Sequence, residues 1–172
     1  MDKIFQITSN QIEKVNKLIF DRINSDNELI SYIANYLLSS GGKGLRPMLS
    51  IASSMIFEKD TDKKIIFLAA AVELIHAATL LHDDVVDKSQ TRRGKKSANN
   101  LWGNQATILV GDYLFSNAFE LMVKTDSLNV LAILSNASCK IAKGEILQLS
   151  SQNNPETSKE DYMKIITSKT AE

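Results

Sequence analysis

Helical periodicity, with few residues to interrupt it, is the feature that most constrains the fold of this chain. Apolar residues recur at helical spacing in several long segments, and no segment alternates apolar and polar residues as a half-buried strand would. The 172 residues include 7 glycines and 2 prolines, fewer than the many turns of a sheet protein require. We therefore predict an all-α fold with about seven helices.

Capping and helix-breaking residues predict the helix boundaries. Asn10 and Glu13 form a candidate cap for the first helix, and Pro47 suits the first turn of the third. Thr157 and Glu160 fit a capping box for the seventh. The predicted helices cover residues 10–23, 27–40, from 47 onward, 62–87, 99–124, 127–150 and the stretch that follows 151–157.

The balance of charge excludes functions that need a strongly basic chain. Lys+Arg and Asp+Glu both total 20, so the chain has no general attraction for nucleic acid or an anionic membrane. The most apolar stretch, residues 65–81, contains Glu73 and His76 and ends in aspartates, so we expect a buried central helix rather than a membrane span. The opening MDKIFQITSNQ is unlike a secretory signal, and we expect a cytoplasmic protein.

The fourth predicted helix carries a polar stripe toward its carboxyl end. At about 100° per residue, five polar residues share an arc of about 100°: Glu73, His76, Asp83, Asp84 and Asp87. Three carboxylates at the negative end of a helix dipole require cations, and hard oxygen ligands without cysteine suit Mg²⁺. The alternative is a solvated acidic helix end paired with Lys88, because a DDxxD pattern alone is weak.

Two basic segments lie near this stripe in the sequence. GGKGLRP, residues 41–47, places Lys43 and Arg46 in a glycine-rich loop that opens a helix, which is a ready anion site or else a plain turn. TRRGKK, residues 91–96, offers Arg92 and Arg93 for bidentate contacts to phosphate oxygens, or else is a solvated loop. Together, carboxylates, Mg²⁺ and arginines describe a clamp for a diphosphate.

The order of these motifs resembles that of the trans-polyprenyl diphosphate synthases. The similar motifs are GGKGLRP, ELIHAATLLHDDVVD, RRG, VGDYLFSNAF, KGEILQLS and KTA, and they extend from about residue 28 to residue 172. The resemblance implies an isoprenoid-synthase-type helical bundle around a central cavity. It also implies that isopentenyl diphosphate is joined to an allylic diphosphate of geranyl or farnesyl type, with Mg²⁺ as the cofactor and no nucleic acid as a partner.

The resemblance implies a role for each matching residue. Those implied to hold Mg²⁺ and the allylic diphosphate are Asp83, Asp84, Asp87, Arg92, Lys169 and Thr170. Of these, the residues implied to take part in catalysis, by assisting ionisation of the allylic C–O bond, are Asp83, Asp84, Asp87, Arg92 and Lys169. Those implied to hold the isopentenyl diphosphate are Lys43, Arg46, His76 and Arg93. Gln148 would point toward the cavity, and His82 and Asp112 would support the site or the fold.

Two residues before the aspartates bear on product length. Ala78 and Thr79 stand where short-chain members of the family often place an aromatic floor. Small side chains there would leave the cavity open for a long product, octaprenyl-like, for a quinone side chain. The alternative is that Ala78 is ordinary helix packing.

One family motif is missing from this sequence. Family members carry a second aspartate-rich motif in their C-terminal half, and no second DDxxD occurs here. We therefore expect residues 1–172 to be the N-terminal part of a single all-helical domain, inactive by itself, from a protein that forms homodimers through its fifth and sixth helices. The alternatives are a non-catalytic partner subunit of a heteromeric synthase, or a terpene cyclase-like enzyme, which the Lys43 and Arg46 site makes less favoured.

Overall fold

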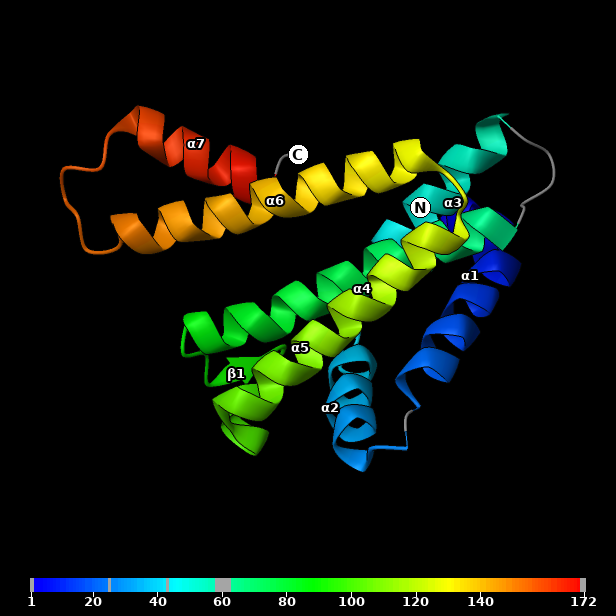
Figure 1. The fold of residues 1–172 in the computed structure, drawn as a ribbon, viewed down its shortest axis with the longest axis horizontal. Coiled ribbons are helices and arrows are strands. Elements are labelled where there is room, and N and C mark those ends of the chain that lie inside the picture. Colours follow the sequence, from blue (N-terminus) through cyan, green and yellow to red (C-terminus); the bar gives the residue numbers. More distant parts are fainter. Residues whose placement is uncertain (1, 25, 43, 58–62, 171–172) are drawn as a thin grey trace. The chain divides into compact units, whose positions relative to one another are not determined.

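A computed structural model describes the backbone of residues 2–24, 26–42, 44–57 and 63–170, and in this part of the chain it is all helical apart from one short hairpin (Figure 1). Two compact units, residues 1–126 and 127–172, are described separately. The elements of the first are α1 (Asp2–Ile23), α2 (Glu28–Ser39), α3 (Leu45–Phe57), α4 (Lys63–Val86), β1 (Thr91–Arg92), β2 (Lys95–Lys96) and α5 (Ala98–Lys124). The second consists of α6 (Leu128–Ser151) and α7 (Lys159–Thr170).

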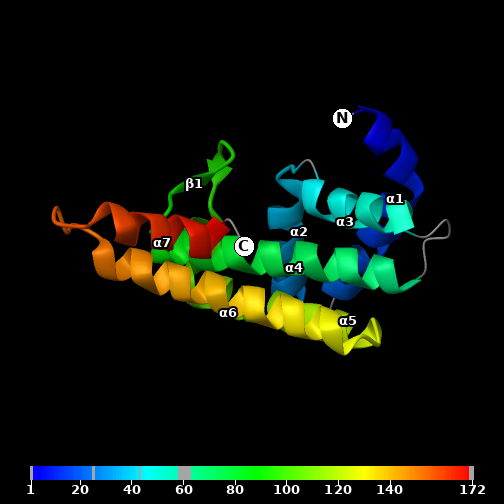
Figure 2. The same cartoon turned by 90° about the horizontal axis from the view of Figure 1, so that it is seen from above.

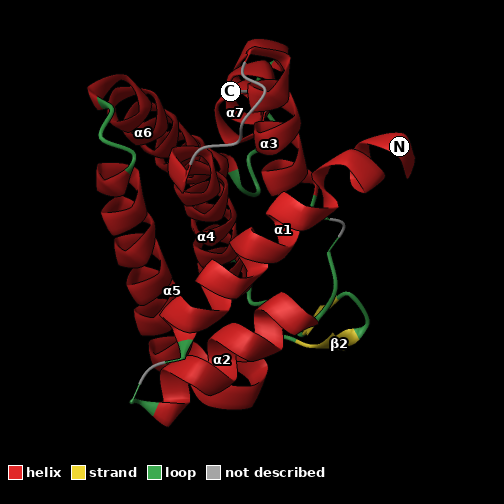
Figure 3. Ribbon diagram, turned by 90° about the vertical axis from the view of Figure 1, so that its right-hand side faces the viewer, coloured by secondary structure: helices red, strands yellow, loops and turns green. Residues whose placement is uncertain are grey.

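The core of the first unit lies along the long α4–α5 pair. α1 contacts α3 and α4, and α2 contacts α5, so these shorter helices lie on the near side of the pair in Figure 3. A Cβ added at Gly111 of α5 would lie 2.4 Å from Nε2 of His82, so the absence of a side chain is what allows the helices to approach there. Fully buried side chains of the pair are Leu74, Leu81, Leu114 and Leu121.

α4 and α5 are also long and apolar enough to cross a membrane by length and composition alone. The buried core helix of a soluble protein meets the same criteria, so this observation decides nothing by itself.

Three predicted helix starts are wrong. α1 begins at Asp2 rather than at residue 10, and its added turns bring Thr8 into the core while residues 3–7 stay exposed. The Thr8 hydroxyl donates to the carbonyl oxygen of Ile4 at 2.8 Å. α3 begins two residues before Pro47. The α7 cap lies one residue later than predicted, because Ser158 Oγ accepts from the backbone N–H of Asp161 at 3.0 Å.

The expectation that the chain contains no strand is wrong for the loop between α4 and α5. Thr91–Arg92 and Lys95–Lys96 form an antiparallel hairpin, which projects from the α4–α5 pair in Figure 2. Its two turn residues, Arg93 and Gly94, have φ of 51° and 78°. Such turns have positive φ at both central positions and favour Asn-Gly, so an Arg-Gly pair gave little sequence signal. A non-glycine residue in this conformation costs about 1–2 kcal/mol and marks a position worth examining for function.

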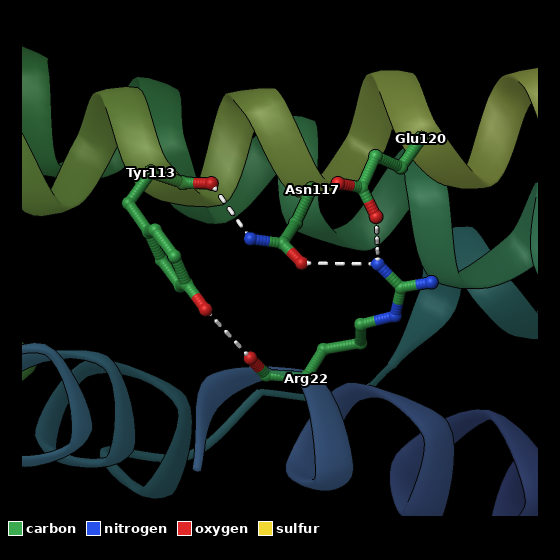
Figure 4. A network of polar contacts seen from close by, with 4 residues as sticks. All are labelled: Arg22, Tyr113, Asn117 and Glu120. Carbon is green, nitrogen blue, oxygen red and sulfur yellow. Dashed lines mark hydrogen bonds and ion pairs between the residues drawn. The ribbon is translucent and has the colours of Figure 1, made fainter. Parts of the chain in front are cut away.

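α1 is tied to α5 by a polar network at its carboxyl end (Figure 4). The Arg22 guanidinium donates to Asn117 Oδ1 at 3.3 Å and forms an ion pair with Glu120. The Tyr113 hydroxyl donates to the carbonyl oxygen of Arg22 at 3.1 Å. This network holds the carboxyl end of α1 against α5 within the first unit.

α6 and α7 of the second unit form a helical hairpin with a close crossing. A Cβ added at Gly144 would lie 2.8 Å from the backbone nitrogen of Lys169. Glycine at this position therefore lets α7 lie directly against α6.

Candidate active site

A cavity of about 440 Å³ lies in the first unit among α1, α2, the α2–α3 loop, the start of α3, α4 and the hairpin turn. Its apolar lining comes largely from α1 and α2: Phe5, Ile12, Ile19, Phe20, Ile23, Leu37 and Leu38. Its polar lining includes Gly42, Gly44, Glu73, His76 and Arg93. The cavity thus has an apolar part and a polar part, as expected of a site for a ligand with a charged head and an apolar tail.

The glycine-rich loop meets the hairpin turn at the polar part. A Cβ added at Gly42 would lie 3.1 Å from Nη1 of Arg93, so the Arg93 guanidinium lies against the loop backbone. Gly44, with φ of 54°, adopts a conformation that favours glycine just before α3, and Arg46 lies exposed in the first turn of that helix. The predicted residue Lys43 falls outside the described residues. The structure therefore brings segments 41–47 and 91–96 together, as the diphosphate-clamp interpretation requires.

Two titratable side chains of α4 face this cationic region. Burial, followed by the charges of Arg46, Arg93 and Arg92, lowers the pKa of His76 to about 4. His76 is therefore neutral near pH 7 and can donate or accept one hydrogen bond without adding charge. Burial raises the pKa of Glu73, against the opposing effect of Arg46 and Arg93.

Asp84 pairs with Arg92 at the end of α4. The carboxylate is 1% exposed, and Arg92 Nε donates to its Oδ2 at 2.9 Å. Its Oδ1 lies 2.8 Å from Nη2 as an ion pair that lacks good hydrogen-bond alignment. The hydrogen bond that Arg92 donates to Asp84, with further contributions from the charges of Asp83 and Asp87, raises the pKa of Arg92. Both Asp84 oxygens thus lie beside Arg92, and only Oδ2 accepts a hydrogen bond from it.

The remaining two aspartates lie one helical turn apart. Asp83 is half-buried and Asp87 is exposed. In the described part of the chain, no three His, Cys, Asp or Glu side chains are arranged to hold a metal ion together. Two carboxylates nevertheless fit Mg²⁺, which commonly takes one or two and completes its octahedron with water and phosphate oxygens. The three-aspartate metal site stays a prediction, with Asp84 set apart from the other two.

His82 and Asp112 support the helix pair. His82 Nε2 lies 3.3 Å from Asp112 Oδ1 and 3.3 Å from the Ile108 carbonyl oxygen. These contacts join α4 to α5 beside Gly111 and match the supporting structural role.

Ala78 and Thr79 do not line the described cavity. Ala78 is fully buried, and the Thr79 hydroxyl donates to the carbonyl oxygen of His76 at 2.8 Å. Their role in product length stays a prediction.

The second unit brings together two further predicted residues. Lys169 Nζ lies 2.7 Å from Glu145 Oε1 and donates to Gln148 Oε1 at 3.0 Å. Sequence reasoning missed Glu145, although its position in KGEILQLS, three residues before Gln148, places it on the same helical face. The side chain of Thr170 lies outside the described residues.

Tyr36 and Ser97 were also missed, and both hold the arginine hairpin. The Tyr36 hydroxyl donates to the Lys96 carbonyl oxygen at 2.8 Å, and the Ser97 hydroxyl donates to the Ser89 carbonyl oxygen at 2.6 Å. The Tyr36 contact spans 60 residues of sequence, so no local pattern could have predicted it.

These features define an all-α protein with an amphipathic cavity, whose polar part is cationic and lies near an acidic helix end. The polyprenyl synthetase family model matches residues 27–172, and the chain belongs to this family. The expected family and the expected all-α fold are both confirmed.

Two curated relatives are named as synthases of long-chain polyprenyl diphosphates. The chain is 43% identical to octaprenyl diphosphate synthase of Escherichia coli, over 99% of this chain and 53% of the relative. It is 39% identical to the geranyl-diphosphate-specific all-trans-nonaprenyl-diphosphate synthase of Rhodobacter capsulatus, over 91% of this chain and 48% of the relative. The chain therefore spans about half the length of the curated relatives it matches.

A solved structure agrees in fold. The polyprenyl synthase of Caulobacter crescentus, complexed with calcium and isoprenyl diphosphate, aligns with a TM-score of 0.93 and 46% identity, covering 98% of this chain and 51% of that one. That protein binds a divalent cation together with an isoprenyl diphosphate.

Proposed function

We propose that this chain contributes the N-terminal half of the active site of a prenyl transferase, which joins isopentenyl diphosphate to an allylic diphosphate. The observation that carries the proposal is the cavity in which Arg93, His76 and the glycine-rich loop meet beside an apolar wall. Family membership and a relative solved with isoprenyl diphosphate support it.

The described side chains perform distinct parts of the reaction. Arg93 and Arg46 bind the diphosphate of isopentenyl diphosphate, and neutral His76 hydrogen-bonds it without adding to their charge. The apolar wall of α1 and α2 keeps water from the developing allylic cation. The second diphosphate lies toward the acidic end of α4, where Arg92 stabilises the charge that develops as the C–O bond breaks.

Asp83 and Asp87 are the residues that would hold Mg²⁺, because both Asp84 oxygens already lie beside Arg92. Bound Mg²⁺ would neutralise and polarise the departing diphosphate. In the second unit, Lys169 is proposed to bind substrate diphosphate, with Gln148 beside it.

The proposed product is a long-chain polyprenyl diphosphate for a quinone side chain. Octaprenyl and nonaprenyl synthase names among the relatives support this, as do the small residues Ala78 and Thr79. In the gene's complete product, we expect Ala78→Phe to shorten the prenyl chain and Lys14→Phe, at an exposed position of α1, to leave it unchanged. Chromatography of dephosphorylated products measures this, and an unaltered length in Ala78→Phe would refute the floor assignment.

We further propose a cytoplasmic homodimer without a membrane span. Mutual packing of α4 and α5, and the polar stripe on α4, support a core role for both helices. Apolar side chains exposed on α5, such as Leu109 and Val123, are available to a second subunit. Sedimentation equilibrium of the complete product tests the dimer.

A second candidate is a non-catalytic subunit of a heteromeric synthase. One relative, 32% identical over 97% of this chain, is named heptaprenyl diphosphate synthase component 2 (Bacillus subtilis). Mg²⁺-dependent incorporation of labelled isopentenyl diphosphate by the gene's complete product, alone and with an added C-terminal half or partner chain, separates the two. Activity that requires another active synthase and survives Asp83→Asn would contradict the catalytic proposal.

A further inference from the structure

Tyr36, on α2, reaches the hairpin that carries both arginines of the site. Its hydroxyl donates to the Lys96 carbonyl oxygen at 2.8 Å. We propose that Tyr36 is a positioning residue, which fixes the β1–β2 hairpin so that Arg92 and Arg93 are presented to diphosphate. The inference rests on the proposed function for its consequence, but the anchoring can be measured without any ligand.

The hairpin needs such an anchor because it is short. β1 and β2 have two residues each, and an isolated two-stranded hairpin is marginally stable at best in water. Lys96 pairs with Thr91, and Lys95 pairs with Arg92. Holding the Lys96 carbonyl therefore holds the strand opposite Arg92, directly before the left-handed turn residue Arg93.

The Tyr36 ring makes two further contacts, one with Trp102 at the start of α5 and one with Lys95 of β2. It meets the Trp102 ring edge to face, with centroids 5.1 Å apart and an interplanar angle of 73°. Lys95 Nζ lies 5.9 Å from the Tyr36 ring centroid. Lys95 stands directly across from Arg92, and like charges in that arrangement are unfavourable, so the ring gives the lysine a favourable partner.

Tyr36 also lies beside the Asp84–Arg92 ion pair. Tyr36, Asp84, Arg92 and Lys96 line one small space of about 10 Å³, which holds no more than about one water. The Asp84 side chain of the pair is 1% exposed, so the attraction within the pair is stronger than it would be in bulk water. Tyr36 therefore holds the hairpin backbone next to the ion pair of Arg92.

The other described anchors of the hairpin do not involve α2. The Asp84–Arg92 ion pair joins β1 to α4. The Ser97 hydroxyl donates to the Ser89 carbonyl oxygen, and the Ser97 N–H donates to the Gln90 carbonyl oxygen at 3.1 Å, so these two bonds close the loop on itself. The tyrosine hydroxyl supplies the link to α2, a helix that lies outside the loop.

Hydrogen exchange tests the anchoring. Tyr36→Phe removes the donor and keeps the ring, and Tyr32→Phe makes the same change one turn earlier on α2, at a side chain that is 60% exposed. One hydrogen bond corresponds to about a 2- to 10-fold change in an equilibrium. We expect amides of 91–97 to exchange faster by about that factor in Tyr36→Phe, with α4 and α5 unchanged and Tyr32→Phe like wild type. Equal hairpin exchange in both variants would overturn the inference.

Titration calorimetry with inorganic diphosphate and Mg²⁺, on the gene's complete product, tests the consequence. We expect Tyr36→Phe to raise the Kd about 2- to 10-fold, and by a smaller factor in an Arg93→Ala background, where Arg92 alone remains to be positioned. A merely structural role would give the same factor in both backgrounds and would overturn the inference. Wild-type protein that binds no diphosphate contradicts the proposed function and this inference with it, whereas wild-type binding that Tyr36→Phe leaves unchanged contradicts the inference alone.

Discussion

The two faces of α4 are both largely apolar, but they differ in how closely they are packed. Toward α5, the helix is closely packed: His82 fits only because Gly111 has no side chain, and Ala78, one turn earlier on the same side, is fully buried. On the other side, Glu73, His76, Ala77 and Leu80 line a cavity of about 440 Å³. One helix thus serves as core on one face and as site wall on the other.

The difference follows from what each face must bury. Small apolar residues lose nothing by close contact, and packing there gains dispersion energy. Removing a carboxyl group or an imidazole from water costs free energy, most of all in its charged form. Burial accordingly lowers the pKa of His76 and raises the pKa of Glu73. Open space on that face therefore has a physical cause in the residues that line it.

Adjacent leucines give the sharpest comparison of the two faces. Leu81 is fully buried, and Leu80 lines the cavity. Leu81→Ala should lower the free energy of unfolding by about 2–5 kcal/mol. Leu80→Ala enlarges an existing cavity and should cost less than about 1 kcal/mol. Urea denaturation measures both, and equal losses would mean that the two faces are equally packed.

Removal of a cation should affect binding and leave stability intact. Arg93→Ala should weaken binding of inorganic diphosphate with Mg²⁺ by about 10- to 100-fold, the loss expected for a charged hydrogen bond. Lys63→Ala, at the exposed first residue of α4, is the matched control for loss of one positive charge. An equal decrease in both variants would show that net charge, rather than the cavity, governs affinity.

Adding a side chain at Gly111, where α5 lies closest to His82 of α4, should destabilise the fold. Gly111→Ala would push against a His82 ring that is held by Asp112, and we expect a loss of about 1–3 kcal/mol in the free energy of unfolding. Ser116→Ala, on an exposed position of α5, should change it by less than about 0.5 kcal/mol. A stable Gly111→Ala protein would mean that His82 swings out at little cost.

Protonation of His76, on the cavity face of α4, should lower the free energy of unfolding. Burial lowers the pKa of His76 to about 4 in the folded chain from the ordinary 6.5 of histidine, so near and below pH 6.5 the unfolded chain binds more protons. Stability should therefore decrease as the pH falls from about 6.5 to 4, by about 1–2 kcal/mol after allowance for solvent screening of a half-exposed ring. Urea titrations of His76→Gln, which lacks this group, should have a shallower slope, and parallel slopes would refute the assignment.

Much of the fold was predictable because helical periodicity is local. The ranges 62–87 and 99–124 agree with α4 and α5 to within a residue, and the polar stripe of α4 does contribute to a cavity wall. The start of α1 was missed because the apolar residues of its first turns, Ile4, Phe5 and Ile7, are exposed and form no buried stripe. The hairpin was missed because Arg-Gly is an uncommon pair for its turn.

The sequence predicted which residue types make up the site, but not which of their side chains contact one another. Sequence placed Arg46, His76 and Arg93 at one diphosphate site, and the structure brings their segments together. It grouped the three aspartates as equals, yet Asp84 is buried against Arg92. Spacing along a helix defines a face, whereas the choice of partner depends on which loop returns to that face.

The sequence by itself determined that this chain is helical, that α4 carries its acidic and imidazole groups on one stripe, and that its motifs are those of the polyprenyl synthetases. Each of these is a property of residue order over a few turns of helix. Only the tertiary structure decided that Tyr36 holds the arginine hairpin from 60 residues away and that Arg93 rests on Gly42. Such contacts join segments distant in sequence, and their energies depend on burial and geometry that arise only when the helices pack.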